Sequence, residues 1–156
     1  MTKCSTDTWQ TIYDLSLGML NDSKTVDEMR DLNPKVALRD CRTIRMGGGR
    51  QNHKTAWIVS MLRQHPNAIV VPVDKAMRNH FITTYQHLFD EGERLINRVF
   101  TVRDLESLDG QKLTSILRRI THVLIDDASF NRRVDDRLME LVSGELSSKT
   151  VIVRMG

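Results

Sequence analysis

Apolar positions along the chain follow two spacings in turn, and this alternation predicts strands and helices. Short runs rich in β-branched residues predict strands, whereas apolar residues three or four positions apart predict helices. The predicted strands are residues 42–46, 68–73, 98–102, 121–125 and 150–153. The helices expected between them are residues 55–64, 75–89, 105–119 (interrupted near Asp109-Gly110) and 132–146. We therefore expect an α/β three-layer sandwich, in which a mainly parallel five-stranded sheet carries helices on both faces.

Residues 1–40 precede this alternation and predict helices only. Residues 6–20 place Trp9, Tyr13 and Leu20 at spacings compatible with an amphipathic helix. The polar segment 21–33 predicts a second, short helix that stops at Asn33-Pro34, because a residue before proline avoids helical geometry. The expected organisation is a helical N-terminal extension, residues 1–40, followed by an α/β domain, residues 41–156.

Composition limits the class of protein. A chain of 156 residues is long enough for one domain with its own core. Lys and Arg number 23 against 20 Asp and Glu, so the net charge of +3 permits contact with nucleic acid without requiring it. Cys4 and Cys41 are too few for a disulfide framework, which indicates a reducing compartment. The N-terminus lacks a signal-peptide core and the longest apolar run is too short to cross a bilayer, so we expect a soluble, cytoplasmic protein without a membrane partner.

Residues 43–62, TIRMGGGRQNHKTAWIVSML, combine a predicted strand, a glycine-rich turn and a predicted helix. With one departure, the P-loop pattern G-x-x-x-x-G-K-[ST] is matched by Gly48, Gly49, Arg50, Gln51, Asn52, His53, Lys54 and Thr55. Backbone N–H groups of such a turn and the positive end of the next helix converge on phosphate. Lys54 would contact the β- and γ-phosphate oxygens, and the Thr55 hydroxyl would ligate Mg²⁺. The alternative is that Lys54 lies on a solvated helix face, which the helix dipole mildly disfavours.

His53 is the departure, because it stands where the pattern has its second glycine. If this position requires a left-handed backbone, a non-glycine residue there costs about 1–2 kcal/mol, roughly tenfold in affinity. Histidine tolerates that conformation better than most side chains. Its imidazole would either obstruct bound phosphates or add a hydrogen bond, and the simpler alternative is an exposed loop histidine.

A second motif, HVLIDD at residues 122–127, supplies acids that a phosphate site would need. Asp126 follows an apolar strand, at the edge where ligands bind in open α/β sheets. We expect Asp126 to ligate Mg²⁺ together with Thr55. Asp127 is the candidate catalytic residue that orients water, with Lys54 as the second. Alternatively, both acids cap the helix that follows.

The segments GGRQNHKT and VLIDDASF together resemble the Walker A and Walker B motifs of P-loop NTPases of the additional-strand class. They are most similar to the ATPase domains of viral DNA-packaging terminases, which typically have Arg-Gln-x-Gly-Lys-Thr and Asp-Glu-Ala-Ser. The resemblance covers residues 42–156. It implies a parallel sheet with the P-loop strand beside the Walker B strand, Mg²⁺ and ATP as ligands, DNA as a frequent partner, and the host cytoplasm as the location of a viral protein. Asp127 departs from the family glutamate by one methylene.

Other residues have alternative interpretations. Arg118, Arg119, Arg132 and Arg133 form either a solvated basic edge, contacts to nucleic-acid phosphates, or an arginine supplied to a neighbouring subunit's nucleotide. Arg154 is a candidate nucleotide sensor. Trp9 and Trp57 are expected in the core or at an interface.

Three functional hypotheses follow. The first is a small P-loop protein that binds Mg-ATP with slow or absent hydrolysis and acts on DNA or RNA. The alternative is a degenerate, non-hydrolysing P-loop fold of phage or mobile-element origin that binds a host or viral protein as an inhibitor or adaptor, and His53 favours it. The third is a basic nucleic-acid-binding protein without nucleotide chemistry, which predicts salt-dependent binding that ATP does not change.

Overall fold

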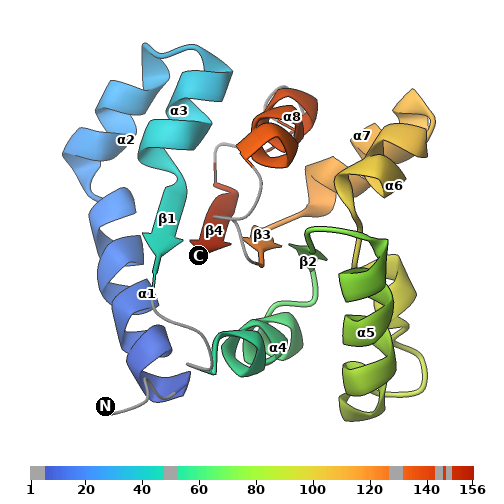
Figure 1. Ribbon diagram of the computed structural model, residues 1–156. Coiled ribbons are helices and arrows are strands. Elements are labelled where there is room, and N and C mark those ends of the chain that lie inside the picture. Colours follow the sequence, from blue (N-terminus) through green and yellow to red (C-terminus); the bar gives the residue numbers. More distant parts are fainter. Residues whose placement is uncertain (1–5, 48–52, 127–131, 143–145, 147–148) are drawn as a thin grey trace.

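The computed structural model describes residues 6–47, 53–126, 132–142, 146 and 149–156, with the backbone alone for residues 132–135 (Figure 1). The helices are α1 Thr6–Leu20, α2 Ser23–Arg30, α3 Pro34–Cys41, α4 Lys54–Gln64, α5 Lys75–Tyr85, α6 Val102–Ser107, α7 Gly110–Arg119 and α8 Arg132–Val142. Two short 3₁₀ helices are η1 Gln86–Leu88 and η2 Leu95–Asn97. The strands are β1 Thr43–Met46, β2 Ala68–Val71, β3 His122–Ile125 and β4 Val151–Met155. Among these residues, none of the helices has the length and apolar character needed to cross a bilayer.

The strands form a parallel sheet in the order β1-β4-β3-β2. The expected parallel α/β architecture is therefore present, but one detail of the expectation is wrong. β1, the strand before the glycine-rich turn, does not neighbour β3, the strand before Asp126, because β4 pairs with both. Strand order depends on pairing between distant segments, which local periodicity does not encode.

Residues 98–102 were expected as a further strand, and this expectation is wrong in the described part of the chain. They form a single bridge between Val70 and Val99, with hydrogen bonds from Val70 N to Arg98 O (2.9 Å) and from Phe100 N to Val70 O (3.0 Å). Helix η2 ends at Asn97, and the capping box of α6 already begins at Thr101. Too few extended residues remain between these helices for a strand, so the described sheet has four strands instead of five.

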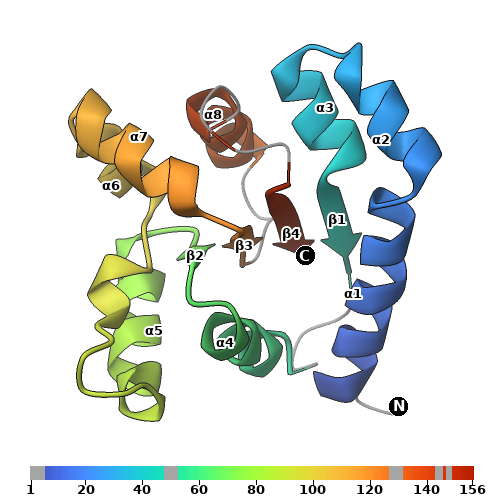
Figure 2. The ribbon, with the colours of Figure 1, turned by 180° about the vertical axis from the view of Figure 1, so that it is seen from behind.

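Two hydrophobic clusters lie on opposite faces of the sheet, because successive strand residues point to opposite faces. On one face, Val70 and Leu124 pack among residues of α1, α4 and α5. On the other, Ile69 and Val123 pack among residues of α3, α6, α7 and α8. The two views in Figures 1 and 2 show these two groups of helices on either side of the row of strands. The expected three layers are therefore present.

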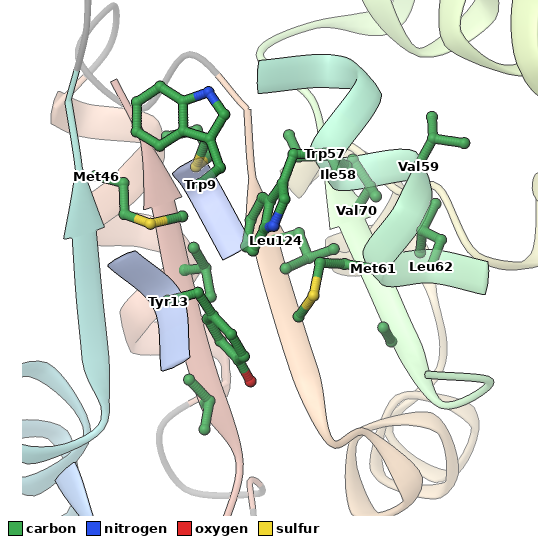
Figure 3. Packing of buried hydrophobic residues seen from close by; sticks show 14 of the residues in the cluster. Trp9, Tyr13, Met46, Trp57, Ile58, Val59, Met61, Leu62, Val70 and Leu124 are labelled. Atoms are coloured by element: carbon green, nitrogen blue, oxygen red, sulfur yellow. The ribbon is translucent and has the colours of Figure 1, made fainter. Parts of the chain in front are cut away.

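Helix α1 packs into the same core as the sheet. Trp9 and Tyr13 are 2% and 3% exposed, and they lie beside Trp57 of α4 and Met46 of β1 (Figure 3). The predicted segment 6–20 is thus confirmed as a helix that buries two aromatic side chains. The core placement of Trp9 and Trp57 is also confirmed, and burial of both rings makes them unsuitable for stacking on a base.

The residues that begin helices mostly agree with their sequence signals. Asp74 caps α5 by accepting a hydrogen bond from Met77 N (2.8 Å), as expected. The predicted break at Asp109-Gly110 separates α6 from α7, and Asp109 caps α7. The short helix predicted to stop at Asn33-Pro34 is confirmed as α2, which ends at Arg30. Pro34 then begins α3, a helix that we did not predict, because Asn33 caps it and proline at its first position needs no N–H partner.

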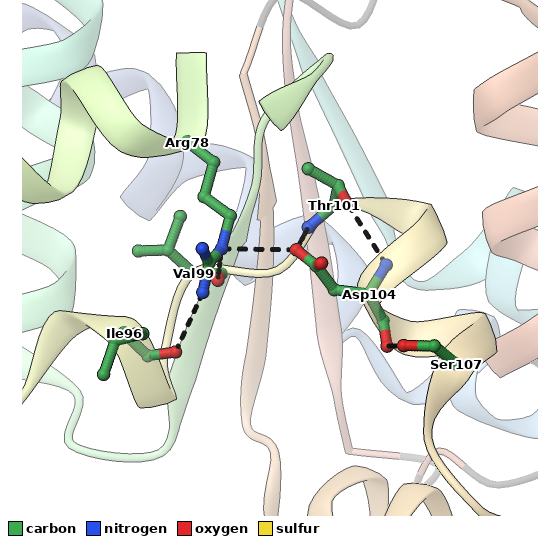
Figure 4. A network of polar contacts seen from close by, with 6 residues as sticks. All are labelled: Arg78, Ile96, Val99, Thr101, Asp104 and Ser107. Carbon is green, nitrogen blue, oxygen red and sulfur yellow. Dashed lines mark hydrogen bonds and ion pairs between the residues drawn. The ribbon is translucent and has the colours of Figure 1, made fainter. Parts of the chain in front are cut away.

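Arg78 joins α5 to the start of α6 (Figure 4). Its Nε donates to Val99 O at 2.9 Å and lies 3.2 Å from an Asp104 carboxylate oxygen. The Asp104 side chain also accepts from Thr101 N, and the Thr101 hydroxyl accepts from Asp104 N, which completes the capping box. This ionic contact between Arg78 and Asp104 holds α5 in place. In the chain, α5 comes after the carboxyl end of β2, and the candidate site lies at the same edge of the sheet.

Candidate functional site

All four strands are parallel, so they end at a common edge of the sheet. We call this the carboxyl edge and define it by the residues that follow the strands, namely Gly47, Pro72, Asp126 and Gly156. The opposite, amino edge is defined by the residues that precede them, namely Arg42, Asn67, Thr121 and Thr150. At the carboxyl edge, Gly156 N donates to Met46 O at 2.9 Å, which keeps β1 and β4 paired to their ends. Both candidate motifs therefore lead to the same edge.

His53 has a left-handed backbone, with φ 56° and ψ 24°. Within the residues that the structure describes, it is the sole non-glycine residue with a positive φ. Its carbonyl accepts the first hydrogen bond of α4, from Trp57 N at 3.0 Å, while its exposed side chain makes no capping bond. The chain thus adopts here the conformation that glycine adopts most readily, at a cost of about 1–2 kcal/mol.

Lys54, the first residue of α4, reaches across the end of the sheet. Its Nζ donates to the main-chain oxygen of Gly156 at 2.6 Å and is partly buried. Gly156 directly follows β4, the strand between β1 and β3. The ammonium therefore lies over the carboxyl edge. The alternative of a solvated helix face would require the ammonium to point into solvent, and it does not.

Thr55 and Asp126 come to this edge from different elements. Thr55 is the second residue of α4, and Asp126 follows β3; both are half-buried. Asp126 N donates to Val71 O at 3.3 Å, which holds the residue beside the end of β2. Neighbouring strands are about 4.8 Å apart. Asp126 follows β3, and Gly156 follows its neighbour β4. The backbones of these two residues are therefore about one strand spacing apart, and Gly156 is the residue that accepts the hydrogen bond from Lys54.

The other predicted site residues lie outside the described residues. These are Gly48, Gly49, Arg50, Gln51 and Asn52 of the turn, and Asp127 of the acidic pair. Predictions for their roles therefore stay predictions.

The chemistry of the described residues fits a phosphate with Mg²⁺. Mg²⁺ is usually held by one or two carboxylates together with substrate phosphates and water, so Asp126 and the Thr55 hydroxyl would be sufficient protein ligands. Among the described residues, no group of three or more His, Cys, Asp or Glu side chains is arranged to hold a metal. A metal site built from protein ligands alone is therefore not found in that part of the chain.

Arg118 and Arg119, one of the two arginine pairs from the sequence, are not brought together with these residues. Arg118 and Arg119 are exposed at the end of α7, just before β3 begins, and so lie toward the amino edge. The side chains of Arg132 and Arg133 lie outside the described residues. Arg154 does lie near the carboxyl edge, half-buried on β4, where burial and the charge of Arg45 lower its pKa.

Sequence reasoning missed a buried polar network at the amino edge. The Tyr13 hydroxyl and His122 Nε2 are joined by a hydrogen bond of 2.7 Å, and His122 Nδ1 lies 2.9 Å from the Thr121 hydroxyl. The His65 ring stacks on His122 with a centroid distance of 4.1 Å. Burial lowers the pKa of His122 to about 4, and burial raises the pKa of Tyr13 to about 12. No spacing in the sequence relates these residues, because they come from three separate elements.

Comparison with known proteins leaves the chain without an assigned family. No protein-family model matches the sequence, and no curated protein is significantly similar to it.

Proposed function

We propose that this protein binds Mg-ATP at the carboxyl edge of the sheet, hydrolyses it slowly or not at all, and acts on nucleic acid. The observation that carries the proposal is the left-handed conformation of His53 directly before Lys54. A strained residue persists only where its surroundings determine it, and such residues concentrate at functional sites. Here the strain occurs at the one position where the sequence departs from the P-loop pattern. The backbone at His53 therefore has the left-handed conformation that a glycine would adopt there, although the side chain is not that of glycine.

The common edge at which the parallel strands end also supports the proposal. β4 lies between β1, which leads into the glycine-rich turn, and β3, which leads to Asp126. This order is not the one that the resemblance implies, in which the two motif strands are neighbours, so the strand order itself does not support the P-loop assignment. Ligand binding at the carboxyl ends of parallel strands agrees with the general behaviour of open α/β sheets.

Each residue has a defined role in this proposal. Backbone N–H groups of residues 48–53 and the start of α4 bind phosphate oxygens. Lys54 exchanges its main-chain acceptor at Gly156 for phosphate oxygens. Thr55 and Asp126 provide oxygen ligands for Mg²⁺, which neutralises phosphate charge when bound. Asp127 orients water, and its short side chain accounts for slow or absent turnover, since a misplacement of about 1 Å costs roughly a hundredfold in rate.

The test compares two lysines that occupy the same position in different helices. Lys54 begins α4, and Lys75 begins α5 after the cap Asp74. Calorimetric titration with Mg-ATP and with a slowly hydrolysed analogue would be performed on wild type, Lys54→Ala and Lys75→Ala. We expect Lys54→Ala to bind at least about tenfold more weakly, because hydrogen bonds to charged groups contribute about 1.5–3 kcal/mol. Lys75→Ala should bind as wild type does.

Two results would contradict this proposal. Wild-type affinity in a correctly folded Lys54→Ala variant would show that the lysine does not hold phosphate. Absence of binding by the wild-type protein would show that the edge is not a nucleotide site.

The exposed imidazole at position 53 favours the alternative, a degenerate fold that binds a host or viral protein without turnover. His53→Gly is the informative variant, because glycine restores the pattern and removes the imidazole. A gain of ATP hydrolysis in this variant would support the alternative. Hydrolysis by the wild type at rates typical of molecular motors would exclude it.

A further inference from the structure

The exposed surface of α1 carries an apolar row beside an acidic row. Ile12, Leu15 and Met19 are 37%, 69% and 74% exposed, and their spacing of three and four residues places them along one side of the helix. Asp7 and Asp14 are also exposed, and they lie about two turns apart along another side. Neither row belongs to the side of α1 that packs into the core. A partner that lies along α1 would therefore meet apolar and acidic groups together.

The segment from α1 through α2, residues 6–31, is acidic although the whole chain is basic. It contains six carboxylates and two cations, a net charge of −4, which leaves 21 of the 23 Lys and Arg and 14 of the 20 Asp and Glu in the rest of the chain. The six exposed carboxylates belong to Asp7, Asp14, Asp22, Asp27, Glu28 and Asp31. Within the described part of the chain, only Asp27 of these six forms an ion pair, with Arg30 at 3.6 Å. This α1–α2 flank therefore suits a partner with a positively charged surface.

Helix α7 provides such a surface, which we call the α7 face. Figures 1 and 2 show α1 and α2 on one flank of the molecule and α7 on the other. The helix has three basic side chains and no acidic one, and Lys112, Arg118 and Arg119 are all exposed. No ion pair among the described residues involves these three cations. The two carboxylates of α6 are already paired with arginines of α5 and α8, so the positive charge of the α7 face is not neutralised by them.

The α7 face is also hollowed. An open hollow of about 440 Å³ lies along the helix, and its lining includes Thr114 together with Arg118 and Arg119. The aliphatic stems of arginine and the methyl group of threonine offer apolar surface beside the charged groups. An exposed side chain such as Leu15 of another copy can therefore pack against these stems, while carboxylates of the α1–α2 flank accept hydrogen bonds from the guanidinium groups.

We propose that copies of this protein associate head to tail, with the α1–α2 flank of one copy against the α7 face of the next. Charge complementarity favours a second copy as the partner, because a flank of net charge −4 meets a helix with three unpaired cations. The two surfaces lie on opposite flanks, so a single copy cannot join its own pair. Repetition of such a contact gives a ring or an open filament. The inference goes beyond the proposed function and requires neither nucleotide nor nucleic acid.

Sedimentation velocity of the full chain, between about 10 and 300 µM protein and in low and high salt, tests the inference, because a contact of this size gives micromolar affinity at best. We expect wild type to form dimers and larger species, and to form fewer of them in high salt, which screens exposed charges. Leu15→Gln alters the α1–α2 flank and Arg118→Glu alters the α7 face. Each should weaken association about tenfold, because Leu15 loses its apolar contact and position 118 then repels the carboxylates.

Two substitutions are matched controls. Met77→Gln replaces another partly exposed apolar side chain on a helix, in α5. Arg63→Glu reverses the charge of an exposed arginine in the last turn of α4, just as Arg118 lies in the last turn of α7. Both variants should associate as wild type does, within about twofold.

A mixture of Leu15→Gln and Arg118→Glu tests whether the two surfaces contact each other. Each variant retains the surface that the other has lost, so the mixture should form a one-to-one dimer that grows no further. Association of the mixture no stronger than that of either variant alone would overturn the inference. A wild type that stays monomeric at about 300 µM in low salt would also overturn it. Equal losses in Arg118→Glu and Arg63→Glu would show a response to net charge alone, and a loss in Leu15→Gln without one in Arg118→Glu would assign the contact to two α1 helices instead.

Discussion

The amino and carboxyl edges of the sheet handle polar groups in different ways. At the amino edge, buried polar side chains are bonded to several fixed partners within the protein. At the carboxyl edge, the prominent polar group is the Lys54 ammonium, bonded to one main-chain oxygen at the start of a strained helix terminus. The first arrangement holds secondary-structure elements together, whereas in the second we propose that the Lys54 ammonium exchanges its main-chain acceptor for a phosphate.

Arg98 illustrates the amino edge. Its side chain is 12% exposed, and it donates to Leu62 O and His65 O at 2.7 Å and to Ala68 O at 3.1 Å. It thereby caps the carboxyl end of α4 and ties that end to β2. A cation at this end of a helix also interacts favourably with the helix dipole.

Arg42 connects other elements at the same edge. It is 6% exposed and donates to the main-chain oxygens of Lys149 and Thr150, and also to the Asn21 side chain. These bonds join the segment between α1 and α2 to the beginning of β4. Burial lowers the pKa of both Arg42 and Arg98, and the hydrogen bonds offset the cost of that burial.

We therefore propose that residues at the amino edge determine stability and that residues at the carboxyl edge bind the ligand. Substitutions at the amino edge should change the free energy of unfolding. Substitutions at the carboxyl edge should change binding while altering stability little.

Replacing Arg98 with methionine should cause the largest loss of stability. The variant removes the Arg98 donor from three part-buried carbonyl oxygens, of which His65 O keeps a hydrogen bond from Ala68 N, and a carbonyl oxygen left without any donor costs about 1–3 kcal/mol. We expect the free energy of unfolding to fall by about 3–5 kcal/mol, a large part of the 5–15 kcal/mol typical of a domain. Urea denaturation would measure it.

Arg63→Met is the control for this prediction, because Arg63 is exposed near the end of α4, the helix that Arg98 caps. It should change the free energy of unfolding by less than about 0.5 kcal/mol. Equal effects of the two substitutions would show that Arg98 does not hold α4 to β2.

Acid should destabilise the protein through His122. Burial lowers its folded-state pKa to about 4, below the value of about 6.5 for an unfolded histidine. The contribution of neutral His122 to stability is therefore complete above about pH 6.5. It is lost as the pH falls toward 4, because His122 binds a proton more strongly in the unfolded state than in the folded state. The loss is about 1.4 kcal/mol per pH unit, or about 2–3 kcal/mol between pH 7 and pH 4.5. His65, whose pKa burial also lowers, contributes in the same direction.

His122→Gln isolates this effect. The variant should lose about 2–3 kcal/mol less than wild type over the same pH interval, measured by urea denaturation at both pH values. His87→Gln, at an exposed position in η1, should follow wild type. A His122→Gln variant with wild-type pH dependence would show that this imidazole does not take up the proton on unfolding.

Much of the fold was predictable because its signals are local. Strand and helix positions follow from periodicity, and Asp74 has cap chemistry that acts within one turn. One error and one omission also have local explanations. Thr101 and Asp104 form a capping box that was available in the sequence and indicated a helix start where we expected a strand. Asn33-Pro34 fits a helix start as well as a helix end.

What could not be predicted depends on contacts between distant segments. The insertion of β4 between β1 and β3 is a property of strand pairing over most of the chain. The partners of Arg98 and His122 likewise come from several elements, and neither residue type indicates burial. At the candidate site, strain at His53 could be predicted from the sequence only on the condition that the turn requires a left-handed backbone at this residue. The backbone angles and the direction of Lys54 came from the structure.

The smallest expected effect is the most specific to the carboxyl edge. His53→Gly should raise the free energy of unfolding by about 0.5–1 kcal/mol, since relief of about 1–2 kcal/mol of left-handed strain exceeds the added entropy of the unfolded chain. His80→Gly is the matched control, because His80 is exposed inside α5, where glycine should lower stability by about 0.4 kcal/mol. Thermal and urea denaturation would measure both. Opposite signs for these two substitutions would confirm that position 53 requires a left-handed backbone, whereas destabilisation by both would remove the observation on which the proposed nucleotide site depends.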